Sequence, residues 1–209
     1  MRKIYDITNL QAFPDKSVTF ALDTHILLWT FYSRCAITKA CQRATYPEFI
    51  KKVISNGNRL VVTTLHLNEM LHFIEKNECD IYNNLKGTRL SLKKFRRLPE
   101  QRLLVQHEIT LILKQLASIP GIDIHASTIR PAIIDAFAQT YASHGCDFFD
   151  YYLLDLCEHS RLAVVSDDVD FICNHSEIDL FTANTQILLK AAESAHDPCN
   201  AGADANPHT

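Results

Sequence analysis

Acidic side chains are concentrated in residues 147–171, which read DFFDYYLLDLCEHSRLAVVSDDVDF. A segment of helical character opens with Asp147 and Asp150 and runs into a short apolar strand at Leu162–Val165. Three aspartates follow that strand: Asp167, Asp168 and Asp170. Two carboxylates about 4 Å apart repel by roughly 4 kcal/mol at an effective dielectric constant near 20. Such a cluster keeps a proton or binds a cation, and a divalent metal is the simplest solution.

Two more acids occupy similar places earlier in the chain. Asp23 ends an apolar strand expected at Val18–Leu22, and Glu69 lies in the first turns of the helix expected after a strand at Leu60–Val62. Continuous apolar strands are typical of a parallel sheet covered on both faces. Because the carboxyl ends of parallel strands meet at one edge, we expect four acids to share a crevice there. They are Asp23, Glu69, Asp150 and Asp168.

Four carboxylates at one sheet edge favour metal-dependent hydrolysis of phosphodiesters. Mg²⁺ and Mn²⁺ are hard ions that prefer oxygen ligands. Two such ions about 3.5–4 Å apart activate a water and stabilise the leaving oxygen. Taken singly, however, Asp23 also fits a helix cap and Glu69 a solvated helix acid.

Several neighbours have either a supporting or a structural interpretation. Thr24 and Ser166 position an acid or a water by hydrogen bonds, or they are ordinary caps. Asp147 competes with Asp150 for the metal, since acids at i and i+3 share a helix face, or it is the helix N-cap. Asp167 and Asp170 are outer or structural acids.

Three sequence blocks together resemble the PIN-domain nucleases. The blocks are FALDTHILLW, VVTTLHLNEM and FFDYYLLDLCEHSRLAVVSDDVDF. They are similar to that family's strand ending in Asp-Thr, its acid in the helix after the second strand, and its Asp-led helix, strand and Ser/Thr-x-Asp-x-Asp-Phe. Asp150 precedes Ser166 by sixteen residues, which looks like the family's spacing. The resemblance covers roughly residues 18–75 and 145–190.

The resemblance implies a three-layer α/β/α fold with a central, mainly parallel sheet, and the residues between the matched blocks are interpreted as a helical insertion. It also implies a Mg²⁺- or Mn²⁺-dependent endoribonuclease that cuts single-stranded RNA. In this implication Asp23, Glu69 and Asp150 are metal ligands, and Asp168 completes the site directly or through water. A toxin silenced by an inhibitory partner protein and a host RNA-processing or defence nuclease are both consistent with it.

The middle of the chain is longer than in compact toxin members of that family. Residues 78–144 are interpreted as a helical and basic insertion, in which Lys86–Arg102 holds seven Lys or Arg against one Glu. Four of these cations are candidate phosphate contacts: Lys93, Lys94, Arg96 and Arg97. The alternative is a solvated face.

Composition limits the class of protein. The 209 residues, 47% of them hydrophobic, fit one domain over residues 1–190 with a flexible polar tail at 191–209. A net charge of −3 and a pI near 6.3 argue against coating nucleic acid by bulk positive charge. Seven cysteines without a CxxC pair indicate no disulfide framework or thiolate zinc site, and they favour a cytoplasmic location. We expect no membrane span, and a homodimer is the default assembly.

Three rival functions are open to discrimination by sequence. Aspartyl-phosphate phosphatases need a second Asp two positions after the first, where this chain has His25. A zinc peptidase needs HExxH, but His66 and His72 flank Glu69 without that arrangement. The third is a catalytically silent PIN-like scaffold that binds RNA or protein.

Overall fold

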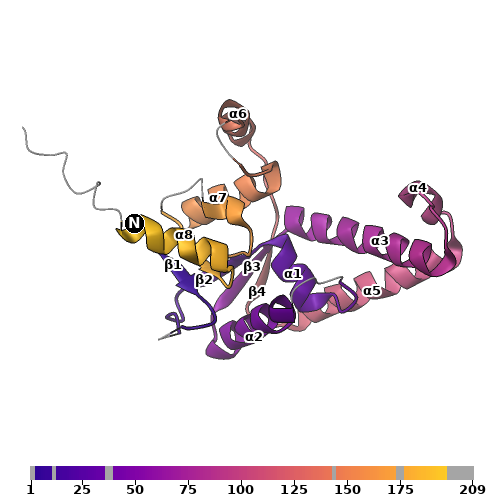
Figure 1. Ribbon diagram of the computed structural model, residues 1–209, viewed down its shortest axis with the longest axis horizontal. Helices are drawn as coiled ribbons and strands as arrows, with labels where there is room; N and C mark the ends of the chain where they lie inside the picture. The colour runs from indigo at the N-terminus through magenta and orange to yellow at the C-terminus, as the bar shows by residue number, and fades with distance from the viewer. Residues whose placement is uncertain (1–2, 11–12, 36–39, 143–144, 173–176, 197–209) are drawn as a thin grey trace, which may run out of the picture.

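A computed structural model describes residues 3–10, 13–35, 40–142, 145–172 and 177–196. Within these residues, six strands form one sheet in the order β1-β6-β5-β2-β3-β4, and every pairing is parallel. The strands are β1 (Ile4–Asp6), β2 (Thr19–Leu22), β3 (Arg59–Thr63), β4 (Ile122–His125), β5 (Ala163–Val165) and β6 (Leu180–Thr182). The expected α/β fold with a central parallel sheet is confirmed (Figure 1).

Helices cover both faces of this sheet. They are α1 (Thr24–Phe31), α2 (Ala40–Asn56), α3 (Thr64–Lys86), α4 (Leu92–Phe95), α5 (Pro99–Ser118), α6 (Pro131–Thr140), α7 (Phe148–Ser160) and α8 (Thr185–His196), with a 3-10 turn at Val169–Ile172. Successive strand side chains point to opposite faces, which separates two cores. Phe20 and Leu22 pack with α1, α2, α3 and α5, whereas Ala21 packs with α7 and α8. The result is a three-layer α/β/α arrangement.

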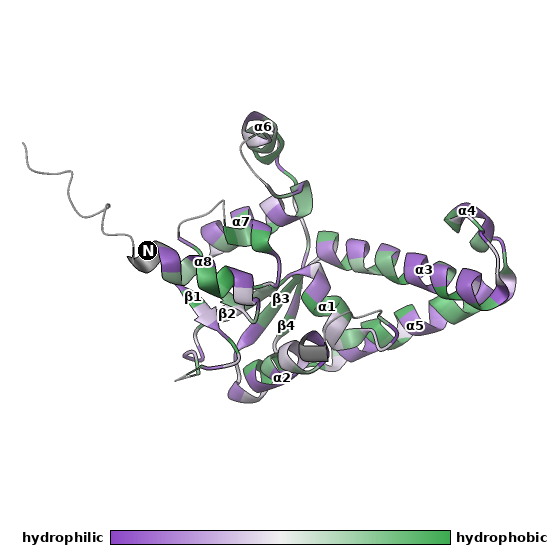
Figure 2. Cartoon of the chain, viewed as in Figure 1, coloured by the Kyte–Doolittle hydropathy of each residue, from purple (hydrophilic) through white to green (hydrophobic). Residues whose placement is uncertain are grey.

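Helices α3 and α5 extend beyond the sheet as an arm. With 23 residues, α3 is about 34 Å long at 1.5 Å per residue. Figure 1 shows α4 at the far end of this arm, where Phe95 is buried with Cys79 and Val105. Hydrophobic and hydrophilic residues alternate along both arm helices (Figure 2). One stripe of each helix therefore packs while the other faces solvent.

The structure corrects three expectations about the elements. Strands β1 and β4 were absent from the sequence interpretation, and β4 lies inside the segment interpreted as a helical insertion. Both are edge strands of three or four residues that contain polar side chains, so they lack the apolar run that marks a buried strand. The polar tail was expected from residue 191, but α8 continues to His196; residues 197–209 lie outside the described residues.

A glycine turn explains how the chain enters β4. Gly121 has φ +83°, and a Cβ there would lie 3.4 Å from the Asn58 carbonyl oxygen. The Gly121 carbonyl accepts a hydrogen bond from the Leu60 N–H at 2.9 Å. Pro120-Gly121 therefore follows the end of α5 and leads the chain into the pairing of β4 with β3.

Two further properties bear on the class of protein. None of the helices within the described ranges combines the length and apolar character needed to cross a bilayer. Among the cysteines whose side chains the structure describes, four are buried free thiols: Cys35, Cys79, Cys146 and Cys157.

Candidate metal centre

The carboxyl ends of β2 and β5 bring Asp23 and Ser166 together. Leu22 is in register with Val165, and the Asp23 N–H donates to the Val165 carbonyl oxygen at 3.2 Å. The Ser166 Oγ then donates to Asp23 Oδ2 at 2.8 Å and accepts from the Asp168 N–H at 3.0 Å. Ser166 thus fixes both Asp23 and Asp168.

Helix α3 brings a third acid to this edge. The Thr63 side chain caps the helix by accepting the His66 N–H at 3.2 Å. Glu69, one turn later, accepts a 2.6 Å hydrogen bond from the Thr24 Oγ1. Because Thr24 directly follows Asp23, this bond joins the start of α1 to α3. Thr24 and Ser166 therefore hold carboxylates in place, which was the supporting interpretation of both.

Helix α7 supplies the fourth acid. Asp147 is its N-cap, and one carboxylate oxygen accepts the N–H groups of Phe149 and Asp150 at 2.8 and 3.1 Å. Asp150 lies in the first turn. The capping interpretation of Asp147 is confirmed. Asp150 is therefore the acid of α7 that joins Asp23 and His66 in the innermost cluster of the site.

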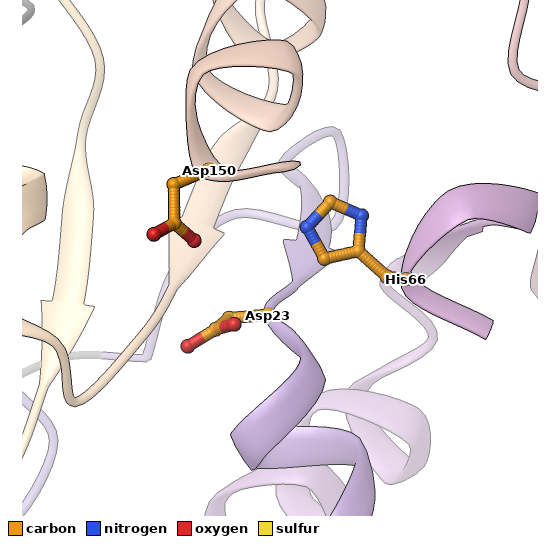
Figure 3. Close-up of side chains that lie close together, drawn as sticks. All are labelled: Asp23, His66 and Asp150. Carbon is orange, nitrogen blue, oxygen red and sulfur yellow. The ribbon is translucent and has the colours of Figure 1, made fainter. Parts of the chain in front are cut away.

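Asp23, Asp150 and His66 form that cluster. One potential ligand atom from each lies within 4.8 Å of the other two. Figure 3 shows both carboxylates and one ring nitrogen of His66 turned toward a shared space. Asp23 and His66 are buried, and Asp150 is half-buried. Ligand atoms gathered within this span suit the surroundings of one ion.

The pKa values of Asp23 and Asp150 indicate that their ionised forms are unfavourable without a cation. Burial, followed by the charges of nearby Asp23 and Asp147, raises the pKa of Asp150 to about 9. Burial also raises the pKa of Asp23 to about 6, against the opposing effect of His25 and the Ser166 hydrogen bond. In the described part of the chain no Lys or Arg forms an ion pair with either. A divalent ion fits this set of oxygen donors.

His66 is the residue that the sequence reasoning missed as a candidate ligand. It was considered only as part of an HExxH motif, which is absent. The available signal was its position three residues before Glu69 on the same helix face. Burial lowers the pKa of His66 to about 4, so the ring is neutral at ordinary pH.

Asp167 and Asp170 lie beside the site with different surroundings. Asp167 accepts hydrogen bonds from the Tyr46 hydroxyl at 2.6 Å and the Gln42 amide at 2.7 Å, which marks a structural role. The Asp170 N–H donates to Asp168 Oδ1 at 2.9 Å, so the two acids form one turn. Burial and Asp168 raise the pKa of Asp170.

An open hollow of about 250 Å³ adjoins the acids on the Asp168 side. His25, Trp29 and Asn184 contribute to its wall together with Asp168. His25 is exposed rather than packed in the core. The hollow gives an extended ligand a way to reach the carboxylates from solvent.

The four basic residues are not at this site. Lys93, Lys94 and Arg97 are exposed around α4, at the far end of the arm from the N-terminus of α3. Arg96 instead makes two hydrogen bonds to Glu75, at 2.6 and 2.5 Å, across the arm. Arg96 is therefore committed to an ion pair. The other three flank it around α4, whose Phe95 packs against Cys79 and Val105 in the outer half of the arm.

The metal-free protein is expected to lose stability as pH rises from about 6.5 to about 8. Across this interval Asp150 is protonated in the native state, because its pKa is about 9, but ionised in the unfolded chain. The native state binds the extra proton, so the unfolding free energy falls by roughly 1 kcal/mol per pH unit. Asp23 and His66 have native pKa values of about 6 and 4 and contribute little there.

Denaturant unfolding in a chelator at several pH values measures this slope. Asp150→Asn should flatten it, while Asp135→Asn, an exposed acid on α6, should retain it. Stability that rises with pH in the parent protein would contradict the electrostatic description.

The comparisons with known proteins assign no family. No protein-family model matches the chain, and no curated protein matches it. Among solved structures, the chain is similar to the crystal structure of PAE2754 from Pyrobaculum aerophilum, with 13% sequence identity and a TM-score of 0.42. The similarity covers 85% of this chain and 94% of that one. Similarity of this degree carries no functional assignment.

Proposed function

We propose that this protein is a metal-dependent endoribonuclease of the PIN-domain type that hydrolyses phosphodiester bonds in single-stranded RNA with Mg²⁺ or Mn²⁺. The observation that supports it best is the meeting of acids from three strand ends at one edge of a parallel sheet, with no described Lys or Arg paired to the innermost two. The block around Ser166 that resembles that family supplies the substrate class.

Each residue of the centre has a separate task in this proposal. Asp23 and Asp150 hold the ion, and Asp168 completes the acidic wall on the side of the hollow. Ser166 keeps Asp23 and Asp168 in register, and Thr24 does the same for Glu69. When bound, a divalent ion would neutralise charge on the phosphate. It would also lower the pKa of a water, which could then lose a proton and attack phosphorus.

The strand would reach the acids through the hollow. Trp29 is half-buried in its wall beside exposed His25, with ring centroids 5.8 Å apart. An aromatic ring of this kind supplies a stacking surface for an unpaired base. A base pair cannot present its face in this way, so the geometry favours a single strand over a duplex.

The direct test is incubation of the purified protein with labelled single-stranded RNA, single-stranded DNA and duplex RNA. Each is incubated with Mg²⁺, with Mn²⁺ or with a chelator. We expect internal cleavage of the single-stranded RNA that depends on a divalent ion and stops in chelator. RNA binding without cleavage under all conditions would instead identify a silent scaffold.

The arm makes a separate prediction about RNA length. Replacing Lys93, Lys94 and Arg97 by Ala should weaken the binding of a long RNA and flatten its salt dependence, since each lost phosphate contact removes released counterions. An oligonucleotide too short to reach from the acids to α4 should bind equally well before and after the change. Arg96 is left in place because its ion pair with Glu75 supports the arm.

Affinity measured against salt concentration for both RNAs checks the prediction. A matched variant with the exposed Lys16, Lys51 and Lys52 replaced removes the same three charges and controls for net charge. An unchanged salt slope for the long RNA would show that the α4 cations contact solvent and not the phosphates of the RNA.

A further inference from the structure

The side chain of His66 has the geometry of a metal ligand rather than of a core histidine. It is fully buried, with 0% of its surface exposed. Its Nδ1 lies 2.6 Å from the Thr63 Oγ1, whereas its Nε2 is buried and has no hydrogen-bond partner among the described residues. A core histidine normally satisfies both ring nitrogens, because an unpaired buried polar atom costs free energy.

The bond to Thr63 sets the direction of the free nitrogen. The Thr63 Oγ1 accepts the backbone N–H of His66 and has a second lone pair that can accept from an Nδ1–H. That tautomer leaves a lone pair on Nε2. Figure 3 shows the ring nitrogen on the side away from the α3 backbone facing the carboxylates of Asp23 and Asp150. A ligating histidine whose other nitrogen is held by an oxygen is the usual arrangement in metal sites.

We infer that His66 Nε2 is a metal ligand together with Asp23 and Asp150, and that this nitrogen makes the site select a first-row transition ion over Mg²⁺. The inference rests on the proposed metal-dependent function and deepens it by naming the metal class. Imidazole suits transition ions, whereas Mg²⁺ takes oxygen ligands almost alone. A centre of two carboxylates and one imidazole therefore favours ions such as Mn²⁺ that accept both donors.

The test uses metal-stripped full-length protein, Mn²⁺ as the probe and no RNA. Pulsed electron paramagnetic resonance of the Mn²⁺ complex detects a directly bound nitrogen by its hyperfine coupling. We expect this coupling in the parent protein and its loss in His66→Gln. The ratio of Mn²⁺ to Mg²⁺ affinity, from calorimetry, should fall by at least about 10-fold in that variant.

The control variant is His72→Gln. His72 is exposed on the same helix, outside the cluster, and its replacement should leave both the coupling and the affinity ratio unchanged. Retained Mg²⁺ binding by His66→Gln shows that the variant is folded. If it does not fold, the parent protein labelled with ¹⁵N-histidine gives the answer alone. If a histidine nitrogen binds Mn²⁺, the label replaces the ¹⁴N coupling pattern by that of ¹⁵N.

The outcomes separate this inference from the proposed function. Bound Mn²⁺ without a nitrogen coupling, or an affinity ratio unchanged in His66→Gln, overturns the inference even if the protein cuts RNA. A histidine coupling in a protein that cuts no RNA supports the inference and removes the nuclease assignment. Failure to bind Mn²⁺ at all overturns both.

Discussion

Asp23→Asn should reduce the cleavage of single-stranded RNA by at least about 10³-fold, because changes to the outer partners of a metal ligand alone cost about 10–100-fold. Asp23 lies at the middle of the acidic edge and is buried, with 4% of its surface exposed. Asn keeps an oxygen to accept the Ser166 hydroxyl but removes the negative charge that holds the ion. The loss should therefore appear in turnover while the fold is kept.

Turnover of labelled RNA under saturating metal measures the effect. Asp155→Asn is the matched control, since Asp155 lies on α7 near Arg130 and is outside the acidic cluster. The control should cleave within a few-fold of the parent protein. Equal cleavage by the parent and Asp23→Asn would remove the chemistry from this site.

Mn²⁺ should stabilise the parent protein by about 2.7 kcal/mol when present at 100 times its dissociation constant. For a chain of this size that corresponds to a rise in melting temperature of roughly 5–10 °C. The reason is that ionised Asp23 and Asp150 repel each other in a buried site until a cation lies between them. At a fixed Mn²⁺ concentration the effect should be larger at pH 8 than at pH 6, since Asp150 must give up its proton to bind the ion.

Thermal unfolding with and without Mn²⁺ measures this shift. The double variant Asp23→Asn/Asp150→Asn should be more stable than the parent without metal, since it removes the buried Asp23 charge and the cost of keeping Asp150 protonated, and it should gain almost nothing from Mn²⁺. An equal Mn²⁺ shift in the parent and the double variant would locate metal binding elsewhere on the protein.

These two expectations describe one trade-off. The acidic edge lowers the stability of the metal-free fold and is compensated elsewhere, by the two cores on either side of the sheet. Sites that violate the usual rules of burial are where function is expected. Stability gained by neutralising these acids should therefore come with lost activity.

The positions of Asp23, Glu69, Asp150 and Asp168 relative to the sheet were accessible from sequence because strand ends control them. Apolar runs locate buried strands, and parallel pairing then carries the residue after each strand to the same edge. Nothing in the pattern gave the side-chain directions. Ser166 and Thr24 were left between two interpretations for that reason, and only their hydrogen bonds to Asp23 and Glu69 distinguish them.

Other features were beyond sequence reasoning for physical reasons. His66 looks like any helix histidine until Thr63 fixes one nitrogen and burial isolates the other. The basic stretch was predicted to contact phosphates or to be a solvated face, and local charge carries no information on its distance from the acids. The Arg96–Glu75 ion pair and the packing of Phe95 on Cys79 place that charge over the outer half of α3.

The most direct test is an anomalous-scattering map from a crystal of the protein soaked with Mn²⁺. We expect a peak between the carboxylates of Asp23 and Asp150, with the His66 ring nitrogen among its ligands and metal–oxygen distances of roughly 2.0–2.4 Å. A well-ordered acidic edge with no peak, or Mn²⁺ bound only elsewhere, would contradict the assignment of this edge as a metal centre.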